Sequence, residues 1–596
     1  MRTGMCLGAG IACLACVAAT AATVPDQVDP RVRAYVAPTR VVWTSSNAGA
    51  YGTRSAVKNA AGLLAAKHGQ VPEKAWLRPS GCTLVNNGDP AGVLLDFGRE
   101  LHGGLQIGNS EFTHGSRVRI RFGESVGEAM ADVGEKGATN DHAVRDAVYQ
   151  LPHLGMLEIG NTGFRFVRID LLSQGKATLE FVRAISLMRP MPRVGAFRSS
   201  DERLNRVWET AVRTVHLCCQ DFLWDGIKRD RLVWMGDTHP ETRAILAVFG
   251  AANVLRDSLD YAAATTPPET AWMNGMANYT LWFLRNTHDW YFYTGDAAYL
   301  KARRDYLVKT VEHVLAETFG EKAAFRTQGF LDWPTQHNKP AVDAGTRGLV
   351  AVALDNAAAL MDVVGEAGVA ARCRAAAAKV RTEKPDPHGA KSAAALLALG
   401  GLRDAKEMYR DVLGRNGHDG VSTFYGYYML EAMSAAGEGR RALDTVRDYW
   451  GAMLDMGATS FWEDFNVAWT NNATRLDALP AAGKKDIHGD FGEFCYPGYR
   501  HSLCHGWSAG PAAWCINRVL GLEALDAGCR TVRVKPFLGD LAWAEGALAT
   551  PRGPVRVRHE RRADGTVATQ VDAPAGVRIV RETPQAPREN AEGKWK

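Results

Sequence analysis

The fourteen-residue stretch WDGIKRDRLVWMGD gathers acidic and basic side chains that could take part in catalysis. Its three carboxylates are Asp225, Asp230 and Asp237, and its spacing fits neither a helical nor a strand period. Thr238 and Glu241 follow with the Ser/Thr-x-x-Glu spacing of a capping box, which predicts that a helix begins there. The stretch is therefore predicted to be a loop at the mouth of a helix.

This loop alone leaves a structural and a catalytic interpretation open. In the structural one, Asp237 helps to cap the helix and the other carboxylates form ion pairs with the cations of the loop. In the catalytic one, the carboxylates converge on a substrate while the cations limit their mutual repulsion. The cations in question are Lys228, Arg229 and Arg231.

A second acidic cluster lies in the segment GATSFWEDFN, where Glu463 and Asp464 stand among aromatic residues. Aromatic neighbours remove a carboxylate from water, so we expect the pKa of Glu463 to be raised. Asp490 and Glu493 are alternative bases further along the chain, and a buried, paired glutamate is the structural alternative. Two separate carboxylates suit cleavage of a glycosidic bond, which needs an acid for the leaving oxygen and a base for water.

The sequence patterns around these clusters predict a multidomain protein with α and β domains. Glycine-punctuated alternating runs predict an N-terminal β-sandwich over residues 38–190. Helical periodicity without a fixed repeat predicts a catalytic (α/α)6 barrel over residues 198–522. Alternation then returns and predicts a small C-terminal β-sandwich over residues 528–585. The segment from Arg189 to Asp201, with two prolines and a Ser-Ser-Asp cap, is predicted to be the hinge into the helices.

Composition restricts the partners and the location. The formal charge is +5 and no run of like charge occurs, which argues against nucleic acid as a partner. An apolar, small-residue start predicts a signal peptide over residues 1–22, with no transmembrane span after its removal. We therefore expect an exported protein, periplasmic or extracellular, with a lipid anchor on Cys16 as the alternative. The sequence leaves the oligomeric state open.

Three motifs together resemble glycoside hydrolase family 78, the α-L-rhamnosidases. They are WDGIKRDRLVWMGDTHPE, GATSFWEDF and HSLCHGWSAGPAAW, which occur in the order typical of that family. The first resembles the short variant of the catalytic loop, with Gly-Ile-Lys where many members have Cys-Pro-x. In the second, Thr459-Ser460 stands for the frequent Thr-Thr and keeps a hydroxyl. The resemblance covers roughly residues 40 to 580 and agrees with the predicted domain order.

This resemblance implies an inverting mechanism that releases terminal α-L-rhamnose from plant-type oligosaccharides, polysaccharide fragments or small glycosides. Asp225 would be the general acid and Glu463 the general base, separated by about 6.5–9.5 Å to leave room for water. The substrate would be bound by hydroxyl contacts and by tryptophan faces near the 6-methyl group. The implied binding residues are Asp230, Asp237, Arg229, His505, Trp234, Trp333 and Trp462.

Other interpretations stay open at this point. The barrel could act on a different α-L-linked sugar, or the protein could bind carbohydrate without turnover. A group of histidines and cysteines invites a metal interpretation, but its H-x6-C-x5-H-x2-C-H spacing matches none of the usual zinc patterns, so we expect neither a metal nor another cofactor. The group consists of His488, Cys495, His501, Cys504 and His505.

Overall fold

The structure is a computed structural model, and it describes residues 28–45, 55–77, 80–111, 115–319, 325, 329–492 and 494–582. The predicted signal peptide and Cys16 lie outside the described residues. Within them, no helix combines the length and the apolar character that a membrane crossing requires. The eight described cysteines are all free thiols, and only Cys495 among them is not fully buried.

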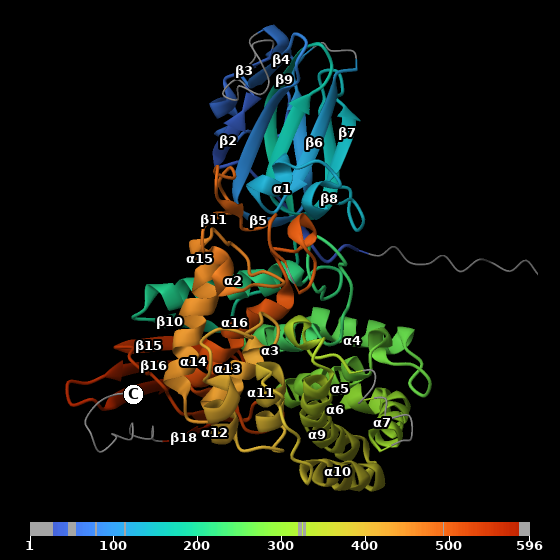
Figure 1. Cartoon of the computed structure of the whole chain (residues 1–596), viewed down its shortest axis with the longest axis vertical. Helices are drawn as coiled ribbons and strands as arrows, with labels where there is room; N and C mark the ends of the chain where they lie inside the picture. The colour runs from blue at the N-terminus through green and yellow to red at the C-terminus, as the bar shows by residue number, and fades with distance from the viewer. Residues whose placement is uncertain are drawn as a thin grey trace, which may run out of the picture.

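The N-terminal region is the predicted β-sandwich, built on one nine-stranded sheet (Figure 1). Three long strands run through its centre, where β5 pairs antiparallel with both β8 and β9, and these strands carry most of the residues of one apolar core. A single turn of helix, α1 (Val126–Met130), follows β6 and is capped by Ser125. The strands are β1 (Val32–Val36), β2 (Arg40–Thr44), β3 (Ser55–Lys58), β4 (Cys82–Asn86), β5 (Ala91–Asn109), β6 (Arg117–Gly123), β7 (Asp146–Gln150), β8 (Met156–Leu171) and β9 (Gly175–Met188).

The central region is helical, as predicted, and its helices are connected by long loops. The first helix begins where the sequence predicted it, because the Asp201 side chain accepts hydrogen bonds from the N–H groups of Arg203 and Leu204. The helices are α2 (Glu202–Cys218), α3 (Thr238–Val248), α4 (Asn253–Thr265), α5 (Ala277–Thr294), α6 (Ala297–Ala302), α7 (Arg304–Thr318), α9 (Lys339–Val364), α10 (Ala367–Arg381), α11 (Lys391–Leu399), α12 (Ala405–Met408), α13 (Gly426–Ala435), α14 (Gly439–Thr445), α15 (Gly451–Asp455) and α16 (Gly510–Trp514).

The C-terminal region forms two small sheets that share one apolar core with the helices. One sheet includes β10, which lies inside the segment that we expected to be a plain hinge. Its residues pair with β15, from Ala196 opposite Ala547 to Ser199 opposite Ala544. The chain thus passes through the C-terminal sheet before it enters the helices. The strands are β10 (Ala196–Ser199), β13 (Leu522–Ala524), β14 (Thr531–Val534), β15 (Trp543–Leu548), β16 (Val555–Arg561), β17 (Val567–Asp572) and β18 (Arg578–Arg581).

The sandwich keeps its own core but meets the helical region at the loops that carry the acidic clusters. Arg165 of β8 donates a hydrogen bond to the carbonyl of Gly457 at 3.0 Å. The N–H of Glu100 in β5 donates to the hydroxyl of Thr459 at 2.9 Å. In Figure 1 the lower end of the sandwich faces the helical region close to α15. The sandwich therefore helps to position the loop that ends in Glu463.

Candidate active site

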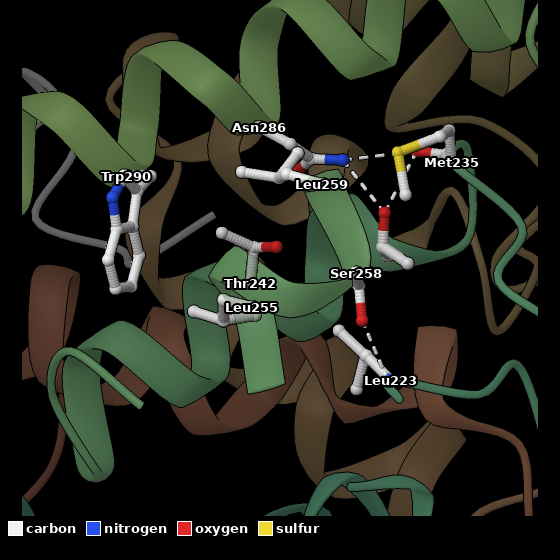
Figure 2. A pocket seen from close by; sticks show the side chains of 9 residues that line it. Leu223, Met235, Thr242, Leu255, Ser258, Leu259, Asn286 and Trp290 are labelled. Atoms are coloured by element: carbon white, nitrogen blue, oxygen red, sulfur yellow. Dashed lines mark hydrogen bonds between the residues drawn. The ribbon is translucent and has the colours of Figure 1, made fainter. Parts of the chain in front are cut away.

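The stretch from Trp224 to Asp237 is a loop between α2 and α3, as predicted. Figure 2 shows two side chains that form hydrogen bonds with the main chain near the two ends of this loop. The Ser258 hydroxyl of α4 accepts a hydrogen bond from the N–H of Leu223 at 2.9 Å, and the Asn286 side chain of α5 donates to the carbonyl of Met235 at 3.1 Å. The small cavity between these anchors has room for about one water molecule, and none of the predicted site carboxylates lines it. It is therefore not the substrate site.

The capping box predicted at the start of α3 is wrong. Asp237 already has helical backbone angles, and the Thr238 hydroxyl donates to the carbonyl of Met235 instead of capping the helix. Glu241 points into the core, and neither of its carboxylate oxygens has a hydrogen-bond donor among the described residues. Burial, followed by the charges of Asp237 and Asp225, raises its pKa well above the usual value.

Asp225 is buried in the loop, with 2% of its surface exposed. Its carboxylate accepts one hydrogen bond, from the N–H of Leu232 at 2.9 Å. Burial raises its pKa well above the usual value, and the charges of Asp237 and Asp230 add to the rise, although His505 opposes it. Burial thus favours the protonated, acid form of Asp225.

Asp237 lies beside His505 and Tyr279. The Tyr279 hydroxyl donates to one carboxylate oxygen at 2.7 Å, and Nε2 of His505 lies 3.2 Å from the other. Burial lowers the pKa of His505, but the hydrogen bond to Asp237 and the charges of Glu463 and Asp225 outweigh that effect and raise it. The structure therefore brings Asp225, Asp237 and Glu463 around one histidine.

Asp230 is the most exposed carboxylate of the loop, with 18% of its side chain exposed. Its Oδ1 accepts a hydrogen bond from Arg229 at 2.8 Å and lies 3.4 Å from Nε2 of His142, which comes from the sandwich. Asp230 and Arg231 both have positive φ, at 50° and 55°, which is an uncommon conformation for two successive non-glycine residues. The loop is therefore turned sharply at the point where Asp230 faces the sandwich.

Glu463 lies on the loop after α15 and is held by several groups. Arg229 donates to its Oε1, the Cys495 thiol donates to the same oxygen at 2.7 Å, and the N–H of Ser502 donates to Oε2 at 3.2 Å. Burial would raise the pKa of Glu463, but the guanidinium of Arg229, with smaller effects of His505 and His501, holds it below the usual value. Our expectation of a raised pKa is therefore wrong, because Arg229 acts more strongly than the aromatic rings.

The pKa of Asp464 is shifted in the opposite direction from that of its neighbour Glu463. Burial raises its pKa to about 7, while a hydrogen bond from the N–H of Phe465 opposes the rise. The N–H of Asp464 donates a hydrogen bond to Nε2 of His501 at 2.9 Å. Asp464 is thus a buried carboxyl group next to the predicted base, and it serves as a matched comparison for it.

The loop cations are divided among different partners. Arg229 binds Asp230 and Glu463 and stacks on Tyr496, with its guanidinium 3.9 Å from the ring centre. Lys228 turns toward the sandwich, and Arg231 donates to backbone carbonyls of His142 and Asn161. The ion pair expected from the structural alternative therefore forms between Arg229 and Asp230, whereas Lys228 and Arg231 bind partners outside the loop. Arg229 also joins the two acidic clusters.

The three predicted tryptophans differ in accessibility. Trp333 is half-buried and packs edge-on against Phe330 and Tyr496, and Trp234 is half-buried beside Tyr279. Trp462 is 1% exposed and packs against Phe465, so it cannot offer a ring face to a sugar. We therefore assign Trp462 to the core.

The histidines and cysteines considered for a metal do not form one group. His505 faces Asp237, Cys495 faces Glu463, and His488 lies between the Ser125 hydroxyl and the carbonyl of His501, at 2.8 Å from each.

The alternative base Asp490 forms an ion pair with Lys136 near the surface, and Glu493 lies outside the described residues.

Several residues of the site were not predicted from the sequence. Tyr279 and Ser502 donate hydrogen bonds to the proposed carboxylates, and Tyr496 lies under Arg229. Cys495 and Tyr496 follow one another in the segment DIHGDFGEFCYPG, where we considered the cysteine only as a metal ligand and did not consider the tyrosine. The thiol and the ring were a signal that could have been read there.

Two family models match parts of the chain. The model of the bacterial α-L-rhamnosidase six-hairpin glycosidase domain matches residues 192–382, and that of the bacterial α-L-rhamnosidase C-terminal domain matches residues 521–595. No curated protein matches the chain in a sequence search.

Solved structures show the same fold over most of the chain. The family 78 rhamnosidase of Bacillus sp. GL1 shares 20% identity and a TM-score of 0.70 over 88% of this chain and 56% of its own. The rhamnosidase of Klebsiella oxytoca, solved with rhamnose bound, shares 18% identity and a TM-score of 0.61 over 82% of this chain and 96% of its own. The α-L-rhamnosidase of Aspergillus terreus shares 18% identity and a TM-score of 0.65, over 83% and 60%.

The chain therefore spans little more than half of the Bacillus protein but nearly all of the Klebsiella one. At these identities the likeness establishes a common fold of sheet, helical and sheet regions. The two domain models match in the same order along the sequence, so the chain is similar to the bacterial α-L-rhamnosidases in both of these regions.

Proposed function

We propose that the protein is an inverting glycoside hydrolase that releases terminal α-L-rhamnose from oligosaccharides, polysaccharide fragments or small glycosides. The observation that carries the proposal is the opposite perturbation of two carboxyl groups in one site. The pKa of Asp225 is raised well above the usual value by burial, and that of Glu463 is lowered because Arg229 outweighs burial. Such pairs mark the acid and the base of a hydrolase.

In the proposed mechanism, Asp225 donates its proton to the glycosidic oxygen as the bond to the anomeric carbon breaks. Glu463, already ionised, accepts a proton from a water molecule whose oxygen bonds to that carbon from the opposite face. The first product is β-L-rhamnose, and the alcohol leaves with the proton of Asp225. One further proton transfer through solvent returns both carboxyl groups to their starting states.

Binding of the sugar would use the remaining polar groups around the two carboxyls. Asp230, Asp237, Arg229 and His505 would contact hydroxyls, and the half-buried Trp234 and Trp333 would lie against the apolar face and the 6-methyl group. In the assay described next, Trp333→Ala should raise KM about tenfold or more and change kcat little, because a stacking ring is worth about 1–3 kcal/mol to binding.

The experiment compares hydrolysis of 4-nitrophenyl α-L-rhamnoside and of an alkyl α-L-rhamnoside. Asp225→Asn should reduce kcat more on the alkyl glycoside, because nitrophenolate leaves with little help from an acid. Glu463→Gln should reduce kcat on both by about 10² to 10⁴-fold, the usual contribution of a general base. Asp464→Asn is the matched control, since it removes the neighbouring buried carboxyl, and it should keep far more activity than Glu463→Gln.

The anomer of the first product, followed by NMR, tests inversion. Initial β-L-rhamnose agrees with a single displacement, and initial α-L-rhamnose rules it out. If the wild type hydrolyses another α-L-glycoside but no rhamnoside, the proposed specificity for rhamnose is refuted and the assignment as a glycoside hydrolase remains. Binding of rhamnose without hydrolysis of any glycoside would indicate a carbohydrate-binding protein.

A further inference from the structure

The six residues His501–Gly506, here called the backing segment, contact both catalytic loops. Ser502 exchanges hydrogen bonds with Glu463, since its N–H donates to Oε2 at 3.2 Å and its carbonyl accepts from the N–H of Glu463 at 3.0 Å. At the other end, the N–H of Gly506 donates to the carbonyl of Asp225 at 2.7 Å. The position of this one segment therefore helps to determine the positions of the proposed base and the proposed acid.

Between these two ends, the backing segment is held by a residue of the N-terminal sandwich. Glu124 follows β6, is 1% exposed, and accepts a hydrogen bond from the N–H of Leu503 at 2.6 Å. Its other oxygen lies 3.5 Å from the Ser502 hydroxyl. Glu124 thus contacts Ser502, which binds Glu463, and its neighbour Leu503.

Glu124 also reaches the catalytic loop through Lys228. The ammonium group of Lys228 lies 3.1 Å from Glu124 and 3.3 Å from Glu128 of α1, and it donates to the carbonyls of Tyr499, at 2.8 Å, and His501. Because Lys228 directly precedes Arg229, this pairing ties the main chain next to Arg229 to the sandwich. All three charged side chains are nearly inaccessible to water.

The same place could be mistaken for a metal site. Ligand atoms of Glu124, Glu128 and His488 lie within 4.8 Å of one another. The ammonium group of Lys228 already supplies a cation to both carboxylates, and Arg145 adds a second cation to Glu128 at 2.8 Å. The cluster is therefore a buried network of ion pairs, whose contacts lead to the backing segment and to the catalytic loop.

We propose that Glu124 is a positioning residue for catalysis, which fixes the backing segment and the start of the catalytic loop so that Asp225 and Glu463 keep their relative placement. The proposal rests on the proposed function for its kinetic part. It gives the N-terminal sandwich a direct part in the active site, although none of its residues need touch the reacting atoms. A misplacement of about 1 Å in a catalytic group can cost roughly 10²-fold in rate.

The test uses two substitutions of Glu124 in the full chain. Glu124→Ala removes the acceptor for the N–H of Leu503, and we expect kcat to fall at least tenfold while KM changes less than threefold. Glu124→Gln keeps an acceptor oxygen in place and should restore most of kcat. Hydrogen exchange of peptides covering the backing segment should become faster in Glu124→Ala and stay close to wild type in Glu124→Gln.

Glu180→Ala is the matched control, because Glu180 is a buried glutamate of the same sandwich whose carboxylate binds Lys67 and Ser80. It should lower the melting temperature without changing kcat or exchange in the backing segment. An equal loss of kcat in both alanine variants would overturn the proposal, since a general loss of stability would then explain it. Unchanged kcat and exchange in a folded Glu124→Ala would overturn it as well.

The exchange measurement separates this proposal from the proposed function. If the wild type hydrolyses no glycoside, the proposed function is refuted. Faster exchange in Glu124→Ala would then still support the anchoring of the backing segment, and unchanged exchange would overturn it.

Discussion

Replacement of Arg229 by methionine should move the acidic limb of the pH profile upward. Arg229 and Glu463 expose 4% and 3% of their side chains, so their ion pair is almost fully desolvated. Removal of one partner of such a pair costs about 3–5 kcal/mol. At 1.36 kcal/mol for each pKa unit, this corresponds to about two to four units in the pKa of Glu463. Water that enters beside the shorter side chain favours the lower end, about two units.

The direction of the shift in the acidic limb follows from the role of Glu463 as a base. It must be ionised, so activity is lost as the pH falls through its pKa, which Arg229 holds below the usual value in the wild type. Without Arg229, burial, which favours the protonated form, is opposed only by the smaller effects of His505 and His501, so the pKa rises. The variant should therefore lose activity at a higher pH than the wild type does. The alkaline limb, where Asp225 loses its proton, should move much less.

The assay is kcat/KM for 4-nitrophenyl α-L-rhamnoside between pH 3 and 9. Arg500→Met is the matched control, because Arg500 stacks on the same Tyr496 ring, 4.2 Å from its centre, but pairs with Asp141 instead of Glu463. Its acidic limb should stay within about half a unit of wild type. An unmoved acidic limb in a folded, active Arg229→Met would refute the assignment of Glu463 as the titrating base.

Two further predictions concern stability and export. Gly506→Ala should destabilise the protein by at least about 1–3 kcal/mol, because the added Cβ would lie 2.0 Å from a buried oxygen of Glu241, whereas Gly368→Ala in α10 has open space and should be neutral or stabilising in thermal unfolding. We also propose that the chain is exported after loss of residues 1–22; N-terminal sequencing of protein from the periplasm or medium should give Thr23, and an uncleaved cytoplasmic chain would contradict this.

The parts of the site that were predictable from sequence are those whose chemistry is concentrated locally. The stretch from Trp224 to Asp237 was predicted to be a loop because its spacing fits neither a helical nor a strand period, although the capping box that marked the start of the next helix is wrong. The acidic cluster at Glu463 was found in the same way. The three regions of the fold were predictable because alternation and helical period differ clearly along the chain.

Contacts between distant segments could not be predicted. The pKa of Glu463 was given the wrong sign because Arg229, its strongest partner, lies in another loop. Strand β10 was taken for a hinge since its partner, β15, lies near the other end of the chain. Trp462 was named as a sugar contact because a segment that mixes aromatic and acidic residues does not indicate which rings face the core. Each of these errors comes from tertiary contacts that no local pattern encodes.

The backing segment also has a consequence for making hybrids of this protein with its relatives. Asp225 and Glu463 lie on loops far apart in sequence, yet both loops meet the same six residues, and Glu124 meets those residues from a third region. A loop transferred alone from a structural relative would bring only one of the two partners of each contact. Chimeras designed to change substrate preference should therefore exchange both loops, the backing segment and the turn after β6 as one unit.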